Sequence, residues 1–152
     1  MTEPAQLEGS RTSNALECAL AFLKTWYGEP TAAGSVRYDP ADALSILRGE
    51  PHARERAEST LGAAFRYIGP DAAALDAIRD RLLQLGHGHT ALIVNGWHPS
   101  EGTGTHAWNA CNHEGRIAWM DTCRGERGPE PLYPDVHGVW AIITDAAGRG
   151  MP

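Results

Sequence analysis

Three residues whose types can share acyl chemistry stand at structured positions of this sequence. His106 and Asp121 lie near the start and at the end of the segment THAWNACNHEGRIAWMD (residues 105–121), in which alternating residues on both sides of a turn predict a β-hairpin. Cys18 lies in SNALECALAFLKTWYG, which has helical spacing. A thiolate attacks a carbonyl carbon, an imidazole moves the proton, and a carboxylate orients the imidazole. Cys18, His106 and Asp121 are therefore the candidate catalytic residues.

The register of the hairpin decides whether the imidazole and the carboxylate meet. A two-residue or four-residue loop around residues 113–114 puts His106 directly opposite Asp121, with about 5 Å between their Cβ atoms. The same register pairs Trp108 with Trp119 on that face. We prefer this register because it satisfies both pairs.

An alternative register remains open. A type I turn with Gly115 in the left-handed bulge position would give a three-residue loop. Asp121 would then pair with Ala107 and point to the other face of the hairpin.

The helix that carries Cys18 has clear boundaries. Asn14 followed by Glu17 forms a capping box, and Gly28 stands where a C-terminal cap is expected. A thiol near a helix N-terminus and beside a histidine has a lowered pKa, which favours the nucleophilic thiolate. The competing interpretation is that Cys18 only packs in the core, because cysteine is among the most buried residue types.

Other assignments for the same residues are weaker. A zinc site lacks the paired Cys-x-x-Cys spacing, and the elements of a zinc nucleobase deaminase are absent. Cys111 and Cys123 are interpreted as structural. The residues of the rejected zinc site would be His106, Cys111, His113 and Cys123.

Helices precede strands along the chain, which predicts an α+β fold. The N-terminal helices should pack on a C-terminal antiparallel sheet, arranged as a meander. Further helices are predicted at 39–47, 52–66 and 69–86, and strands at 90–96, 105–112, 115–121 and 139–144.

Composition narrows the class of protein. The 152 residues, 42% of them hydrophobic, suit one domain at 13–146, with residues 1–12 as a disordered leader or linker and 147–152 as a tail. A net charge of −6 argues against nucleic-acid binding, and no apolar run approaches the length of a membrane span. Three cysteines do not make a disulfide framework, which favours a reducing compartment.

Three segments together resemble a known family. NALECALA (14–21), LGAAF (61–65) and GTHAWNACNHEGRIAWMD (104–121) are similar to the papain-fold toxin family of protein glutamine deamidases, which are C-terminal domains of bacterial polymorphic toxins and effectors. The likeness covers nearly all of residues 13–146. It implies a papain-like cysteine-enzyme fold.

The resemblance also implies roles for individual residues. Cys18 becomes the nucleophile, His106 the general base, Asp121 the residue that orients it, and Asn14 a helix cap or an oxyanion donor. The chain departs from the family where Ala15 replaces a second cysteine, and where residues 122–123 replace a glutamine after the aspartate.

The substrate is expected to contact tryptophan. The glycine-rich loop at 95–104 directly precedes His106, and we expect it to form one wall of the substrate cleft. Trp97 and Trp108 are the candidate substrate contacts, although a surface loop and a core tryptophan are the simpler alternatives.

The implied function is a bacterial toxin or effector domain that deamidates glutamine side chains of a target protein, without a metal or other cofactor. Such a domain would be made in the bacterial cytoplasm and delivered into a target cell, and it predicts an immunity partner. A cysteine peptidase or transglutaminase could use the same triad. An inactive papain-fold binding module is the alternative outside the enzymes.

Overall fold

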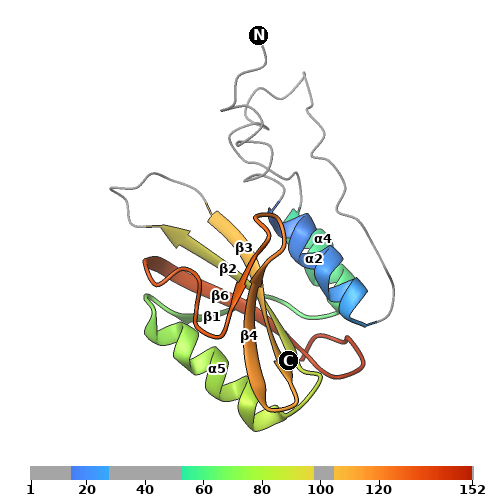
Figure 1. Ribbon diagram of the computed structural model, residues 1–152. Coiled ribbons are helices and arrows are strands. Elements are labelled where there is room, and N and C mark those ends of the chain that lie inside the picture. Colours follow the sequence, from blue (N-terminus) through green and yellow to red (C-terminus); the bar gives the residue numbers. More distant parts are fainter. Residues whose placement is uncertain (1–14, 28–52, 98–104, 152) are drawn as a thin grey trace, which may run out of the picture.

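The computed structural model describes residues 15–27, 53–97 and 105–151 (Figure 1). The helices are α2 (Ala15–Trp26), α4 (Ala53–Leu61) and α5 (Ala73–Leu85). The strands are β1 (Arg66–Gly69), β2 (Thr90–Trp97), β3 (Thr105–His113), β4 (Arg116–Asp121), β5 (Glu126–Gly128) and β6 (Val136–Thr144). This composition agrees with the predicted α+β class. The helix expected at 39–47 lies outside the described residues.

The described strands form one antiparallel sheet in the order β1-β6-β2-β3-β4-β5. The sheet is not the simple meander that the chain order predicted, because β6 returns to pair between β1 and β2. The edge strands β1 and β5 were not predicted. Both are short, and their residues are mostly exposed, so they lack the apolar alternation that marks the inner strands.

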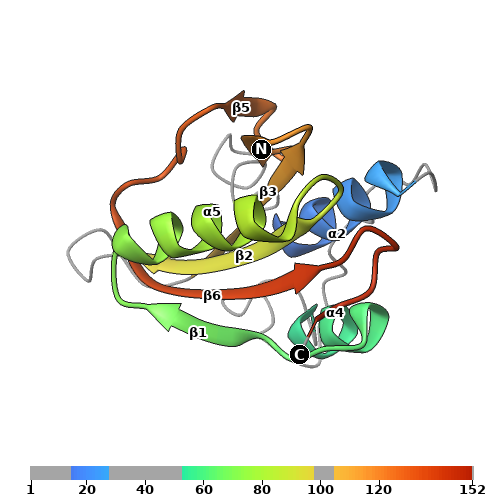
Figure 2. The ribbon, with the colours of Figure 1, turned by 90° about the horizontal axis from the view of Figure 1, so that it is seen from below.

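The sheet carries helices on both faces, as the two views show (Figure 1, Figure 2). Ile93, Trp108 and Trp119 face α5 in one buried cluster. Leu92 and Ile142 face α2 and α4 in the other. Because alternate residues point to opposite faces, the run Ala-Leu-Ile in β2 is buried throughout. The described part of the chain contains no helix long and apolar enough to cross a bilayer.

The turn between β3 and β4 corrects the preferred hairpin register. Its two central residues are Glu114 and Gly115, and both have positive φ, at 54° and 83°. A turn with positive φ at both central residues matches the twist of a hairpin, and centring it here places a glycine at one of those two positions. His113 therefore pairs with Arg116, and Trp119 pairs with Ala110 rather than with Trp108.

Two segment boundaries also differ from the predictions. The helix expected at 52–66 ends at Leu61, because Gly62 adopts a φ of 76° and the chain then enters β1. The segment predicted as a C-terminal tail instead folds back on the domain. Gly150 donates a hydrogen bond to the carbonyl of Leu61 at 2.7 Å, and Met151 donates one to Ile143 at 2.7 Å.

Candidate active site

His106 and Asp121 meet in the folded chain, although they are not direct strand partners. His106 is the second residue of β3, and Asp121 is the last residue of β4. Continuing the observed register puts Asp121 opposite Trp108, so His106 is its diagonal neighbour on the same face. His106 Nε2 lies 2.6 Å from Asp121 Oδ2, and both residues are buried. The predicted contact is present, but the register predicted for it was wrong.

The protonation of this pair follows from Asp121. Burial acts to raise the pKa of Asp121, but hydrogen bonds from His106 and Tyr133 outweigh burial and hold that pKa below its ordinary value. The ionised carboxylate can only accept hydrogen bonds, so His106 Nε2 carries a proton. In the neutral imidazole, Nδ1 is then the basic nitrogen.

Nδ1 of His106 is buried and has no hydrogen-bond partner among the described residues. Buried polar atoms without partners are rare in folded proteins. An imidazole with one nitrogen held by a carboxylate and the other without a partner can act chemically as a general base.

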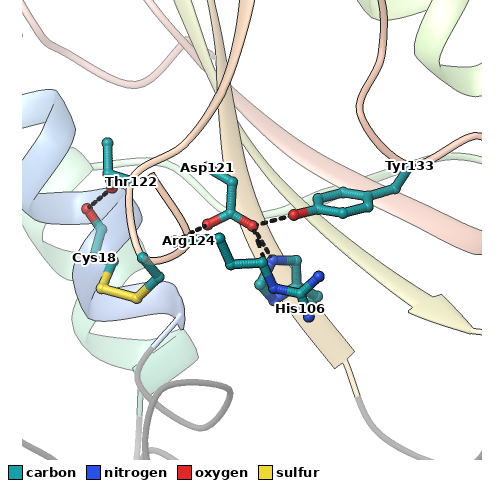
Figure 3. Close-up of a disulfide and its surroundings, with 7 residues drawn as sticks. Cys18, His106, Asp121, Thr122, Arg124 and Tyr133 are labelled. Atoms are coloured by element: carbon teal, nitrogen blue, oxygen red, sulfur yellow. Dashed lines mark hydrogen bonds and ion pairs between the residues drawn. A yellow bond between two sulfur atoms is a disulfide. The ribbon is translucent and has the colours of Figure 1, made fainter. Parts of the chain in front are cut away.

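Two residues that sequence reasoning missed hold the carboxylate (Figure 3). The Tyr133 hydroxyl donates a short hydrogen bond to Asp121 Oδ2, the oxygen that also accepts from His106. The Arg124 backbone N–H donates to Oδ1 at 3.2 Å. The Arg124 guanidinium lies over the Tyr133 ring, 5.4 Å from its centroid. Tyr133 lies between β5 and β6 in a proline-rich segment without periodicity, so no sequence pattern indicated it.

Aromatic rings enclose the imidazole of His106. Trp97 stacks on it with centroids 6.1 Å apart, and Tyr133 meets it edge-on at 5.3 Å. Trp97 and Tyr133 also contact each other at 5.7 Å. Trp97 is half-buried at the end of β2, so part of this predicted substrate contact faces solvent beside His106.

Trp108, the second predicted substrate contact, lies in the core. It is 1% exposed, packs on Trp119 and Tyr133, and donates a hydrogen bond from Nε1 to Asn95 Oδ1 at 2.8 Å. Trp108 therefore packs against Tyr133 inside the core and is not exposed to a ligand.

Cys18 is bonded to Cys123, a pairing that the sequence did not predict, because its three cysteines favoured a reducing compartment. The Cα atoms of the pair are 5.6 Å apart, and 105 positions separate them in sequence. The turn after β4 meets α2 at this point, because its Thr122 Oγ1 also donates to the Cys18 carbonyl at 3.2 Å (Figure 3). In this state the Cys18 sulfur is neither a thiol nor a thiolate.

Cys111 is the remaining cysteine. It is buried in β3, and burial raises the pKa of its thiol to about 11, against the opposing effect of a hydrogen bond with the Ala118 backbone. At neutral pH it is protonated and inaccessible. Its structural interpretation agrees with this environment.

Other predicted positions can be placed only in part. Asn14 and most of the loop at 95–104 lie outside the described residues. Among the described residues, no group of three or more His, Cys, Asp or Glu side chains is arranged to hold a metal ion.

Comparison with known proteins identifies the family. No curated protein matches the chain. A family model described as papain fold toxin 1, glutamine deamidase, matches residues 13–126, which is more than half of the chain and includes Cys18, His106 and Asp121. The chain belongs to the papain fold toxin 1, glutamine deamidase family.

Proposed function

We propose that this domain hydrolyses the side-chain amide of glutamine on a target protein, using Cys18, His106 and Asp121. The observation that carries the proposal is the buried His106–Asp121 pair, in which Nε2 is held at 2.6 Å and Nδ1 is left without a partner. This pair lies within the segment that matches a glutamine deamidase family. Cys18 supplies the nucleophile once its sulfur is reduced.

The reaction has two halves. In the first, His106 Nδ1 takes the proton of the Cys18 thiol, the thiolate forms a bond to the carboxamide carbon, and the C–N bond breaks as His106 passes that proton to the departing ammonia. In the second, His106 removes a proton from water, which attacks the thioester and releases glutamate and the thiolate. Asp121 keeps Nε2 protonated and stabilises the imidazolium that forms between these transfers.

The tetrahedral intermediate needs donors for its oxyanion. Backbone N–H groups at the start of α2 lack intrahelical partners and point toward the N-terminal end of the helix, where Cys18 lies in the second turn. Asn14, immediately before α2, is the proposed side-chain donor or cap.

Tyr133 is proposed as a positioning residue. Its hydroxyl fixes Asp121, and its ring meets His106 edge-on, so it restrains both members of the pair. Trp97 restrains the imidazole from a second side and is the proposed substrate contact. A restrained imidazole keeps Nδ1 in one direction, which a proton relay requires.

The test is direct detection of the product. Purified wild type and Cys18→Ala, both treated with dithiothreitol, are incubated with a bacterial lysate, and peptide masses are compared. Conversion of specific Gln residues to Glu by the wild type alone supports the proposal. Cys111→Ala is the matched control, because it removes a buried thiol far from the proposed chemistry and should remain active. Peptide fragments or crosslinks instead would indicate a peptidase or a transglutaminase.

The disulfide favours a second candidate function, an inactive papain-fold binding module in which Cys18 and Cys123 form a permanent structural cross-link. In that case reduced wild type and Cys18→Ala would leave identical peptide masses. Cys18→Ala and Cys123→Ala would then lower stability equally, because each removes the same cross-link, and neither would change any substrate.

A further inference from the structure

The disulfide joins the proposed nucleophile to the turn that holds its catalytic partner. Cys123 lies two residues after Asp121, and the next residue, Arg124, donates its backbone N–H to Asp121 Oδ1. Thr122, in the same turn, is hydrogen-bonded to the carbonyl of Cys18. One covalent bond therefore ties α2 to the end of β4 at the proposed active site (Figure 3).

The chemical consequence for the proposed reaction is simple. A sulfur within a disulfide has no thiolate lone pair to attack a carboxamide, so the oxidised chain cannot begin the acyl transfer. We propose that the Cys18–Cys123 disulfide is a redox gate, which keeps the domain inactive until a dithiol reductant opens it. This inference rests on the proposed function, because it regulates the same nucleophile.

A dithiol reduces the disulfide in two exchange steps and needs no other reactant. One thiolate of the dithiol attacks a sulfur of the disulfide, the Cys18–Cys123 bond breaks, and a mixed disulfide forms. The second thiol of the reductant resolves it, so the reductant leaves as a disulfide and the protein gains two electrons and two protons. Both cysteines are only half-buried, which gives a reductant access that the buried Cys111 does not have.

Several contacts that do not involve the disulfide should keep the fold intact after reduction. The inner face of α2 packs on Leu92, Ala107 and Ile142 of the sheet through buried side chains, none of which depends on the disulfide. The hydrogen bond from Thr122 to Cys18 uses the backbone carbonyl and needs no sulfur. Asp121 keeps His106 and Tyr133 in either state, because these contacts lie within the sheet and the loop before β6.

For the reduced protein to be active, the Cys18 thiol must ionise readily. Cys18 is the fourth residue of α2, near the positive end of the helix dipole. That position favours the thiolate after reduction. A purely structural cross-link does not require that one of its cysteines lie near a helix N-terminus.

The test compares the wild type with Cys123→Ser, which cannot form the disulfide but keeps all three proposed catalytic residues. Each protein is purified without reductant and incubated, with and without dithiothreitol, in a bacterial lysate freed of small thiols, with Gln-to-Glu conversion measured by peptide mass. The wild type should gain at least 100-fold in activity on reduction. Cys123→Ser should be active without reductant and change less than twofold, while Cys111→Ala should respond as the wild type does.

Each other outcome has a definite meaning. If unreduced wild type, with the disulfide verified by mass, is as active as the reduced protein, the gate is refuted and the proposed function stands. If Cys123→Ser still requires dithiothreitol, the gate is also refuted. If reduced wild type and Cys123→Ser both convert no more glutamine than Cys18→Ala, the proposed function fails, and the gate fails with it. Circular dichroism of Cys123→Ser and a second variant, Cys123→Ala, separate misfolding from loss of chemistry.

Discussion

Tyr133→Phe removes one hydroxyl from the site and leaves the ring in place. The phenylalanine keeps the edge contacts with His106 and Trp108, so the change isolates the hydrogen bond to Asp121. A hydrogen bond to a charged group contributes about 1.5–3 kcal/mol to stability. Tyr133 is only partly buried, so we expect the lower end, about 1.5 kcal/mol, and the loss of this donor should raise the pKa of Asp121.

The pH dependence distinguishes this hydrogen bond from simple packing. The folded-state pKa of Asp121 is lowered, so its carboxylate adds stability above the unfolded pKa of about 3.9, and that stability is lost as the pH falls through the folded pKa. Because Asp121 should have a higher pKa in Tyr133→Phe than in the wild type, the stability gap between the two proteins should be full at pH 7 and should shrink below about pH 4.

The assay is urea unfolding of oxidised wild type and Tyr133→Phe from pH 7 to pH 3. Tyr67→Phe is the matched control, because Tyr67 is 58% exposed and should change stability by less than about 0.5 kcal/mol. A stability gap that stays constant into acid would refute the assignment to Asp121. In deamidation assays on the reduced proteins, a positioning role predicts a lower kcat with little change in KM.

Three further changes have defined outcomes. Asp121→Asn should lower kcat by roughly 10³-fold or more, since the imidazole would lose its fixed tautomer, and ammonia release measures this. Reducing the Cys18–Cys123 bond, which spans 105 positions, should lower the free energy of unfolding by about 4–5 kcal/mol if chain entropy dominates, as urea curves with and without dithiothreitol would show. Tyr27→Phe removes a hydroxyl that donates to the Asp145 carbonyl at 2.6 Å and contacts Thr144 at 2.9 Å, so it should cost about 1 kcal/mol and lower the Tm by about 2–4 °C in thermal unfolding.

The chemistry of the site was largely predictable because it depends on local patterns. Alternation along residues 105–121 indicated the hairpin, and the preferred one of its two possible registers placed His106 and Asp121 on one face. The turn moved by one residue on each strand, which preserved that face while changing the direct partners. The predicted contact between His106 and Asp121 is therefore present although the predicted register was wrong.

The burial of individual tryptophans was harder to predict, because it depends on which helices cover each face of the sheet. Trp97 and Trp108 were both candidates for substrate contact, yet Trp97 lies half-buried beside His106 and Trp108 is buried in the cluster that faces α5. Alternation along β2 and β3 could not show that both faces of the sheet carry helices. Burial of a tryptophan in an inner strand is decided by what packs above it.

By itself, the sequence determined the helices and inner strands and the residue types available for acyl chemistry, since these depend on neighbours within a few turns or one hairpin. It favoured a register that puts His106 and Asp121 on one face, and the structure decided between that face and the alternative. Only the tertiary structure decided that Cys18 meets Cys123 and that Tyr133 holds Asp121. These contacts depend on the positions of the turn after β4 and of the loop before β6 in the folded chain. That placement results from packing summed over the whole sheet and its helices, which no short stretch of residues encodes.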